Sequence, residues 1–469
     1  MMIFRSAGKT PRRILIARGD ALGDLVLATV LIRPLREMFP DAEIYFLARK
    51  EMIPLLMGIP EVAGVVENTM SYAWSWSELP AFWKLRQEIK ALSPDLFIGL
   101  WEKRRYAFLS FFSQVPRRLG YAMSWIHRCL YTDVVPVDFR FFFTHQAAYN
   151  LAILTPLALS GSQLKGKNAL LTMPPRPYIG CPAAWWTTLE SRYPHVKMSY
   201  VCVQVDGSAM QKTWPSETCL SVVRYLSSRY PYVVLLGRPD DQRRLVLNAG
   251  VADLPNILDL TDQLSLPDVV AVLSRAQLFV GLDSGFAHLA SAFSVPSVVY
   301  FLNRTQNALR WAPLGDHVHL VFSRHDCPDR CVPSSCQKKT CREGLTVSEL
   351  FLAIGRAARG EICAQEARFS QLTVGVISYS PEALLSFFHV KNIRAIHVSP
   401  DMGMQEMAKI FSEANVMWLL LDRVPYRFAY RLARIVVSNY VMWPPLFFPV
   451  TGVSDVADFL ENPFSQYSQ

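Results

Sequence analysis

Long apolar runs are missing from this sequence. No stretch of about 18 apolar residues is uninterrupted, which is the length that a helix needs to cross a bilayer, so we expect no membrane-spanning segment. Residues 1–10 lack the apolar core of a secretory signal peptide. Nine cysteines without such a signal predict a reducing compartment and mostly free thiols. Together these features predict a cytoplasmic protein.

Two glycine-rich phosphate-binding motifs are also missing. The loop that follows the first expected strand places glycine only at Gly19 and Gly23, which does not match G-x-G-x-x-G, and no G-K-S/T follows it. This argues against a dinucleotide-dependent oxidoreductase and against a P-loop ATPase. Asp24 opens the next helix, where its structural role would be an N-terminal cap.

Acidic residues are fewer than basic ones. The chain holds 39 Asp and Glu against 48 Lys and Arg, a net charge of +9. A basic surface suggests an anionic partner such as a nucleotide, a phosphorylated glycan, an acidic lipid or a nucleic acid. The apolar share of 51% argues against disorder, and 469 residues predict two to four domains.

Strand-length apolar segments alternate with helical patterns in the first half. Residues 13–17 and 42–47 are expected strands, with a helix at 25–39 between them. Pro34 predicts a kink in this helix. A β-α-β unit of this kind predicts a parallel sheet with right-handed crossovers, and therefore the α/β class.

The same alternation restarts in the second half. Residues 160–177, rich in glycine and proline, indicate an interdomain linker. A strand at 200–205 leads into a loop with one lysine, Lys212, and a polar turn at 237–241 follows a later strand. Two doubly wound domains would bind ligand at the carboxyl ends of their strands, where all these loops lie.

The junction at Asp283, Ser284 and Gly285 organises this second domain. It lies between an expected strand at 276–280 and a helix that begins near His288. Free backbone N–H groups and the positive end of the helix dipole favour an anion there, and glycine lets the backbone approach a phosphate. The structural alternative is an ordinary strand-to-helix turn with Asp283 or Ser284 as the cap.

The chain carries several short motifs in this order: Gly23-Asp24, Lys212-x-Trp214-Pro215, Asp283-Ser284-Gly285-x-x-His288-Leu289-Ala290 and Trp311-Ala312-Pro313. This set resembles glycosyltransferase family 9, which contains the lipopolysaccharide heptosyltransferases. Arg118-Leu119-Gly120-Tyr121 is also similar to the family's arginine-glycine-tyrosine loop. The resemblance covers roughly residues 12–360. It implies the GT-B fold, two facing Rossmann-like domains with the nucleotide-sugar on the C-terminal one, and an inverting reaction without a metal-holding D-x-D motif.

The resemblance also implies a role for each site residue. On the donor side, Lys212 and Ser208 match contacts to the diphosphate, the stretch Asp283, Ser284, Gly285 and His288 matches the helix-terminus cradle, and either Asp240 or Asp241 holds the ribose hydroxyls. Asp24 matches the general base. On the acceptor side we expect Arg104, Arg105, Arg117 and Arg118. A lysine and helix N–H groups stabilise a departing diphosphate without a metal cofactor, and a base deprotonates the acceptor hydroxyl.

The implied function is transfer of a heptose from ADP-heptose onto a glycan or glycolipid acceptor similar to the lipopolysaccharide core. The alternative is a non-catalytic basic scaffold or nucleic-acid-binding protein on the same fold, which interleaved aromatic and basic residues would suit. The enzyme is favoured because Asp24, Lys212 and His288 occur together, so nucleic acid is not an expected partner.

An aromatic and basic stretch lies in the first half. Trp74, Trp76, Phe82 and Trp83 are followed by Lys84 and Arg86, and residues 108–112 continue this character. Such a surface fits a membrane interface or a phosphorylated acceptor, and it predicts peripheral contact with the cytoplasmic face of the inner membrane. The structural alternative is core aromatics beside solvated charges.

Two features depart from the family pattern. Four cysteines, Cys327, Cys331, Cys336 and Cys341, lie within fifteen residues and are close enough in sequence for a structural zinc or iron site, although free thiols or a disulfide also fit. The tail alternates expected strands at 372–378, 394–398 and 416–421 with helices at 381–388, 404–414 and 427–440, and shows no catalytic pattern.

These patterns predict the domain boundaries. We expect an N-terminal acceptor-side domain at 1–165, a linker at 166–195, a nucleotide-sugar domain at 196–367 that includes the cysteine-rich loop 327–341, and a small α/β extension of unknown role at 368–469.

Overall fold

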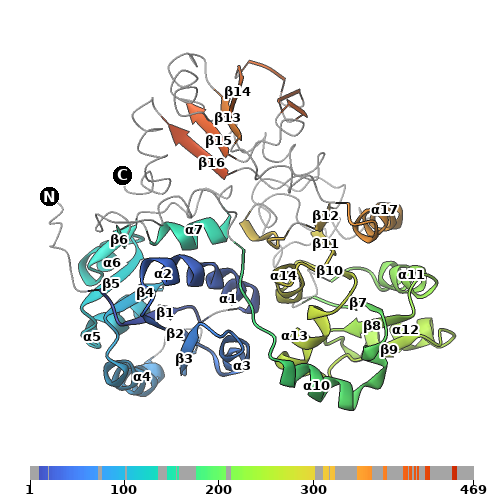
Figure 1. Ribbon diagram of the computed structural model, residues 1–469, viewed down its shortest axis with the longest axis horizontal. Helices are drawn as coiled ribbons and strands as arrows, with labels where there is room; N and C mark the ends of the chain where they lie inside the picture. Colours follow the sequence, from blue (N-terminus) through green and yellow to red (C-terminus); the bar gives the residue numbers. More distant parts are fainter. Residues whose placement is uncertain are drawn as a thin grey trace. The chain divides into compact units, whose positions relative to one another are not determined.

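The computed structural model of the chain is shown in Figure 1. It describes residues 10–19, 21–71, 76–100, 103–135, 145–154, 156–157, 176–207, 213–301, 310–315, 317–322, 346–361, 373–377, 394–399, 401–403, 406–407, 409–410, 418–422 and 446–450. These residues form two compact units. Unit 1 contains the described residues of 10–135 and 146–180, and unit 2 contains residue 145 and the described residues of 181–450.

Unit 1 is built on a six-stranded sheet in which every pair of neighbours is parallel. Its order is β3-β2-β1-β4-β5-β6. The strands are β1 (Arg13–Ala17), β2 (Glu43–Ala48), β3 (Val62–Glu67), β4 (Leu96–Gly99), β5 (Arg117–Tyr121) and β6 (Asp133–Val135). The strand order reverses between β1 and β4, and a doubly wound sheet binds ligands outside the carboxyl ends of the strands at such a point.

Helices cover both faces of this sheet. They are α1 (Leu22–Ala28), α2 (Ile32–Met38), α3 (Ile53–Met57), α4 (Leu79–Leu92), α5 (Arg104–Phe112), α6 (Trp125–Leu130) and α7 (Gln146–Ala152), with short 3₁₀ turns η1 (Thr29–Leu31), η2 (Lys50–Met52) and η3 (Trp76–Glu78). Right-handed crossovers place α4, α5 and α6 on one face, since their connections run in the opposite direction from those of α1 to α3. Leu15 and Phe97 of the sheet pack with Leu85 of α4 and Leu109 of α5 in one core cluster.

The helix expected at 25–39 is interrupted. The structure has α1, the 3₁₀ turn η1 and then α2. Pro34 has no N–H, and its ring crowds the carbonyl four residues earlier, at Val30 inside η1. The predicted irregularity is therefore real, and it falls one turn before the proline.

Unit 2 contains a second six-stranded parallel sheet, of order β12-β11-β10-β7-β8-β9. Its strands are β7 (Tyr200–Gln204), β8 (Tyr232–Leu236), β9 (Ile257–Asp259), β10 (Phe279–Leu282), β11 (Ser297–Phe301) and β12 (Val318–Phe322). Its helices are α10 (Ala183–Arg192), α11 (Ser216–Ser227), α12 (Asp241–Val251), α13 (Leu266–Ser274), α14 (Gly285–Ala292) and α17 (Val347–Ala358), with a 3₁₀ turn η4 (Pro194–Lys197). Here the order reverses between β7 and β10, which sets the ends of these strands as the binding edge.

A third, four-stranded parallel sheet lies in the tail. It contains β13 (Thr373–Ile377), β14 (Arg394–Val398), β15 (Trp418–Asp422) and β16 (Leu446–Val450), in the order β14-β13-β15-β16. The three expected strands are confirmed, and β16 was not predicted. Pro449 argues against a strand in sequence reasoning, yet an edge strand such as β16 tolerates proline.

Other expectations for the chain's organisation fall mostly outside the described residues. Most of the linker at 160–177 lies there, as do the expected helices 381–388 and 427–440 and most of 404–414. The domain boundaries therefore stay predictions. Within the described residues, none of the helices combines the length and the apolarity that crossing a bilayer requires.

Candidate functional site

The junction between β10 and α14 forms a capped helix N-terminus. Ser284 is the N-cap in extended conformation, and its Oγ accepts a hydrogen bond from the N–H of Ala287 at 3.4 Å. The capping alternative for Ser284 is therefore confirmed. A cap uses one of the first-turn donors, and the dipole and the remaining first-turn N–H groups of Gly285 and Phe286 still favour an anion.

Gln204, the last residue of β7, holds this junction in place. Its buried carboxamide oxygen accepts hydrogen bonds from Ser284 Oγ at 2.6 Å and from the N–H of Leu282 at 3.5 Å. Its amide nitrogen donates to the carbonyl of Asp206 at 2.7 Å. One side chain thus joins the ends of the two central strands to the helix cap. We did not identify Gln204 from the sequence, although a polar amide that ends a buried strand is a usable signal.

Ser208 and Lys212, the expected diphosphate contacts, lie outside the described residues, but the two ends of their loop are described. The N–H of Gly207 donates to Thr213 Oγ1 at 3.0 Å, which brings the loop's ends together beyond β7. Trp214 is fully buried and donates from Nε1 to the carbonyl of Val205 at 3.0 Å. The loop that carries Lys212 therefore starts and finishes at the binding edge of the sheet.

A buried arginine fixes both flanks of that loop. Arg243, on α12, donates from Nε to the carbonyl of Val205 at 2.8 Å and from Nη1 to the carbonyl of Trp214 at 3.0 Å. It also contacts Ser216 Oγ at 3.1 Å. Nothing in the sequence pattern singled out Arg243, because its partners lie 27 to 38 positions earlier in the chain.

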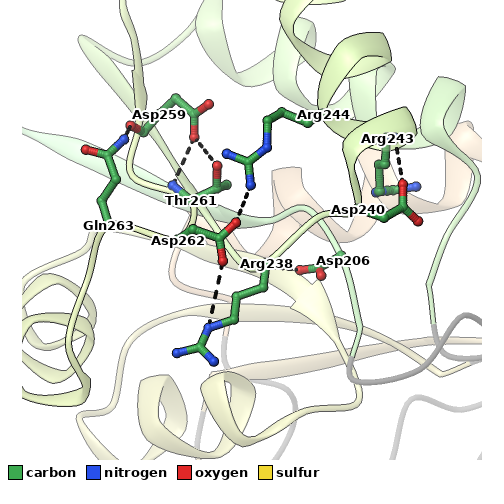
Figure 2. Close-up of polar contacts among 9 residues, drawn as sticks. All are labelled: Asp206, Arg238, Asp240, Arg243, Arg244, Asp259, Thr261, Asp262 and Gln263. Carbon is green, nitrogen blue, oxygen red and sulfur yellow. Dashed lines mark hydrogen bonds and ion pairs between the residues drawn. The ribbon is translucent and has the colours of Figure 1, made fainter.

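The turn after β8 places the two candidate ribose-binding carboxylates. Asp240 is the N-cap of α12 and accepts from the N–H of Arg243 at 2.8 Å (Figure 2). Asp241 is the exposed first residue of the helix. Gly237 adopts a φ of +140°, and a Cβ there would lie 2.1 Å from Asp206 Oδ1, so glycine is required. The ribose assignment stays a prediction for either residue.

Further polar groups surround this turn. Asp206 Oδ1 accepts from the N–H of Arg238 at 3.0 Å, while burial raises the pKa of the Asp206 carboxyl. Asp262 pairs with Arg244 and lies 3.9 Å from Arg238 Nε. Figure 2 shows it between the two arginines. Asp262 and its two arginines are each more than one-third exposed, so these ion pairs position the loops rather than contribute much stability.

Two buried histidines belong to this edge of unit 2. His288 lies in the first turn of α14 as expected, and its side chain is buried. His145 was not predicted. Its Nε2 donates to the carbonyl of Ala312 at 2.8 Å, within the Trp311-Ala312-Pro313 motif. Because a carbonyl only accepts, this bond places the proton on Nε2. The pKa of His145 is lowered to about 3, mainly by burial and also by the neighbouring charges of His288 and Arg310.

In unit 1, Asp24 is held by a buried arginine. Asp24 is the third residue of α1, and its Oδ1 pairs with Arg18 Nη2. The Arg18 side chain is 4% exposed and Asp24 18% exposed, and Arg18 Nη1 donates to the carbonyl of Leu100 at 2.5 Å. The N-cap of α1 is Ala21. The Asp24 carboxylate is therefore directed at Arg18, and it remains partly open to solvent. We did not predict this contact.

Three of the four candidate acceptor arginines have partners within unit 1. Arg105 is buried and donates to the carbonyl of Ser71. Arg117 pairs with Asp133 at 3.2 Å, and Arg118 donates to the carbonyls of Val115 at 2.6 Å and Leu130 at 2.8 Å. Burial lowers the pKa of Arg118. Arg104 is exposed at the start of α5. The acceptor role of all four stays a prediction.

The four clustered cysteines, Cys327, Cys331, Cys336 and Cys341, lie outside the described residues, so the metal site stays a prediction. In the part of the chain that the structure describes, no group of three or more His, Cys, Asp or Glu side chains is arranged to hold a metal ion. The four cysteines described there, Cys129, Cys181, Cys202 and Cys219, are free thiols. Burial raises the pKa of the Cys219 thiol to about 12, which makes it unreactive.

Replacing Gln204 should weaken both the fold and donor binding. Gln204→Leu leaves the hydroxyl of Ser284, the N–H of Leu282 and the carbonyl of Asp206 without this partner, and buried polar groups without partners cost about 1–3 kcal/mol each. Only Leu282 is fully buried, and the half-buried Ser284 and Asp206 can partly bind water instead, so we expect the unfolding free energy to fall by about 2–3 kcal/mol in urea denaturation, with weaker nucleotide binding. Gln263→Leu, at an exposed glutamine of the same unit, is the control. A neutral effect of Gln204→Leu would contradict the linking role.

His145 should make stability depend on pH. Its folded pKa is about 3 against 6.5 unfolded, so between these values the unfolded chain binds more protons. The free energy of unfolding should therefore fall as pH drops, by about 2 kcal/mol between about pH 7 and about pH 5 relative to His145→Gln. Urea denaturation at a series of pH values measures the difference, with His195→Gln, at an exposed histidine, as control. Parallel curves for wild type and His145→Gln would show that His145 is not buried in its neutral form.

The comparisons with known proteins agree with this arrangement. Residues 82–345, more than half of the chain, match the family profile "Glycosyltransferase family 9 (heptosyltransferase)". The chain is 26% identical to Lipopolysaccharide heptosyltransferase 3 of Escherichia coli over 287 residues, which are 60% of this chain and 80% of that protein. It is 22% identical to Lipopolysaccharide core heptosyltransferase OpsX of Haemophilus influenzae over 349 residues, 71% of this chain and 91% of that protein.

Solved structures of low sequence identity share the fold. A family 9 glycosyltransferase from Veillonella parvula superposes with a TM-score of 0.61 at 16% identity, covering 76% of this chain and 99% of that one. ADP-heptose lps heptosyltransferase II of E. coli gives a TM-score of 0.59 at 18% identity, covering 74% and 99%. Two parallel six-stranded sheets with these neighbours confirm the GT-B fold with two Rossmann-like domains. The chain belongs to glycosyltransferase family 9 and is a glycosyltransferase.

Proposed function

We propose that this glycosyltransferase transfers a heptose from ADP-heptose to a glycan acceptor of the lipopolysaccharide core, with inversion at the anomeric carbon and without a catalytic metal. The observation that carries the proposal is the binding edge of unit 2, where the capped N-terminus of α14, the flanks of the Lys212 loop and the turn after β8 meet at the strand ends. The names of the curated relatives, which are lipopolysaccharide heptosyltransferases, support the choice of donor and acceptor.

The diphosphate of the donor would bind at the start of α14. Ser284 Oγ is engaged with Gln204 and the N–H of Ala287, so its part is to hold the helix end in position. Backbone N–H groups at Gly285 then approach the phosphate directly, with Asp283 and His288 shaping the turn. Lys212, with Ser208, supplies the charge that neutralises the leaving group. These fixed donors stabilise the charge that develops on departure, which is the task a metal performs in other transferases.

The nucleoside would lie toward the turn after β8. Asp240 already accepts one backbone hydrogen bond through Oδ1, and Asp241 is exposed beside it. Either carboxylate can accept hydrogen bonds from the two ribose hydroxyls, since an ionised carboxylate has several acceptor positions. The specific residue remains open between these two.

The acceptor would react on the side of Asp24. Its carboxylate takes the proton of the acceptor hydroxyl, the hydroxyl oxygen bonds to the anomeric carbon, and the bond to the nucleoside diphosphate breaks with its electron pair leaving on the phosphate. A single displacement of this kind inverts the anomeric centre. Arg18 keeps the carboxylate oriented, and the exposed Arg104 is the most accessible of the proposed acceptor arginines.

Replacing Asp24 tests the base. Asp24→Asn should lower kcat by roughly 10²–10⁴-fold, the usual contribution of general-base catalysis, with donor affinity nearly unchanged. The same change also leaves buried Arg18 without its carboxylate, which costs stability in its own right. The double variant Arg18→Met with Asp24→Asn removes that unpaired charge. If Asp24 is the base, the double variant regains thermal stability but not turnover; recovery of both would identify Asp24 as a structural partner of Arg18 instead.

A screen of nucleotide-sugars tests the donor. A ligand at 100 times its dissociation constant stabilises the folded protein by about 2.7 kcal/mol, which a thermal shift detects. We expect ADP-heptose to give the largest shift, and Lys212→Ala to reduce both the shift and turnover because its charge meets the diphosphate before and during departure. Lys197→Ala, at an exposed lysine of unit 2, is the matched control. A larger shift with another nucleotide-sugar would replace the donor while keeping the enzyme class.

A further inference from the structure

Two polar side chains enclose the backbone at Gly19. This residue follows Arg18 beyond the end of β1 and precedes α1, the helix that contains Asp24. A Cβ atom at Gly19 would lie 2.4 Å from Asn68 Nδ2 and 2.6 Å from Tyr106 Oη, and Cβ atoms essentially never approach other atoms within 3.0 Å. The backbone of Gly19 is not left-handed, so this close approach is the reason for glycine here.

Asn68 and Tyr106 form a fixed, buried pair. Asn68 follows β3, and its N–H donates to the carbonyl of Ala48 at 2.7 Å. Its Oδ1 accepts from the N–H of Met70 at 3.2 Å, which identifies the other side-chain atom, Nδ2, as the donor to Tyr106 Oη at 2.9 Å. Asn68 is 6% exposed and Tyr106, on α5, is 0% exposed. The pair is therefore out of reach of a substrate and gives Gly19 a rigid surface on which to pack.

Gly19 is also held through its carbonyl. Arg49, the residue after β2, donates from Nε to this carbonyl at 3.1 Å. One residue before Gly19, the N–H of Arg18 donates to the carbonyl of Leu47 in β2 at 3.1 Å. Contacts from the ends of β2 and β3 and from α5 thus converge on residues 18 and 19, which leaves this piece of backbone little freedom to shift.

Asp24 depends on this backbone through Arg18. The Arg18 guanidinium donates from Nη1 to the carbonyl of Leu100 and pairs through Nη2 with Asp24 Oδ1. The Arg18 side chain is 4% exposed, so it has little space in which to reorient. A shift of the backbone at Gly19 would move the Cα atom of Arg18, and the Asp24 carboxylate would lose its alignment with the guanidinium.

We propose that Asn68, Tyr106 and Arg49 are positioning residues for the transfer reaction. They fix the backbone at Gly19, and thereby the direction in which the Asp24 carboxylate meets the acceptor hydroxyl. A displacement of about 1 Å from the reacting geometry can lower turnover by about 10²-fold. The inference rests on the proposed role of Asp24 as the base, and it requires no contact between the three positioning residues and the substrate.

Tyr106→Phe tests the pair with the smallest change. It removes Oη, the acceptor for Asn68 Nδ2, and keeps the ring. Turnover is measured with ADP-heptose and a truncated lipopolysaccharide core. We expect kcat to fall by about tenfold, less than for a displacement of about 1 Å, with KM for ADP-heptose unchanged because the donor would bind unit 2.

Tyr200→Phe is the matched control. The buried hydroxyl of Tyr200, at the amino end of β7 in unit 2, donates to the carbonyl of Val272 at 2.7 Å. This variant also loses one buried hydrogen bond of a tyrosine, so its thermal stability should fall to a similar extent while kcat stays unchanged.

Gly19→Ala displaces the backbone directly. The added methyl group would meet both polar atoms of the pair, so the chain at residue 19 has to move, and we expect kcat to fall by about 10²-fold. Arg49→Met should also lower kcat, since the carbonyl of Gly19 loses its donor, whereas Arg49→Lys keeps a donor and should retain most of the turnover. KM for the acceptor should be unchanged in both Arg49 variants.

A double-mutant cycle separates positioning from general weakening of the fold. If Tyr106 acts through Asp24, Tyr106→Phe should lower kcat in the wild type but not further in the Asp24→Asn background, where the carboxylate is already absent. A loss that came only from a weaker fold would lower kcat by the same factor in both backgrounds.

Each failure has its own signature. Equal factors in the two backgrounds, or unchanged kcat in Tyr106→Phe and Gly19→Ala, would overturn the positioning role while Asp24 remains the base. A raised acceptor KM at unchanged kcat in Arg49→Met would make Arg49 a substrate contact instead. Near-normal turnover of Asp24→Asn alone would show that the proposed base is wrong, and the inference would fall with it.

Discussion

Parallel pairing of the strands is the constraint on which the rest of this structure depends. In each six-stranded sheet every carboxyl end points to the same edge, so loops that are far apart in sequence begin side by side. The candidate functional residues of unit 2 come from the ends of β7, β8 and β10, and Asp24 of unit 1 follows β1. The sheet holds the ends of these loops in place before any ligand binds, so the candidate residues that they carry start from fixed positions.

Polar residues at the ends of buried strands then set the geometry of each edge. Gln204 follows four apolar residues of β7 and joins two strands to a helix cap, and Arg18 follows β1 and holds Asp24. Both side chains are buried, and a buried polar group that loses its hydrogen-bond partner lowers the stability of the fold. Such residues do not need to touch a substrate to decide where the reacting groups lie.

Two arginines of unit 1 support the packing of aromatic rings. Arg86 and Arg118 use their guanidinium groups on backbone carbonyls and lie over the rings of Trp83 and Phe111. Their charge therefore serves the packing of α4, α5 and β5, which keeps neighbouring rings at the surface. Lys84 and Arg128, on α4 and α6, are instead exposed to solvent. Composition alone counts all four side chains as basic surface. Only their different burial separates the packed arginines from the exposed cations.

The sequence by itself determined the alternation of strands and helices and the α/β class, because periodicity is a local property of neighbouring residues. It also limited the cap of the organising turn to Asp283 or Ser284, and the structure selects Ser284. The sequence also located three of the tail's four strands and missed β16, whose Pro449 is tolerated because the tertiary structure makes this strand an edge. Motif resemblance supplied the candidate roles of Asp24 and the donor residues.

Only the tertiary structure decided which partners those residues have. Gln204 and Ser284 are 80 positions apart, and Arg18 and Leu100 are 82 apart, so no local pattern predicts that they meet. Phe82 is buried while its neighbour Trp83 is exposed, although both read alike as aromatic residues of one helix. The physical reason is the same in each case: strand order and helix packing determine which side chains lose contact with water, and burial determines what a polar or aromatic group does.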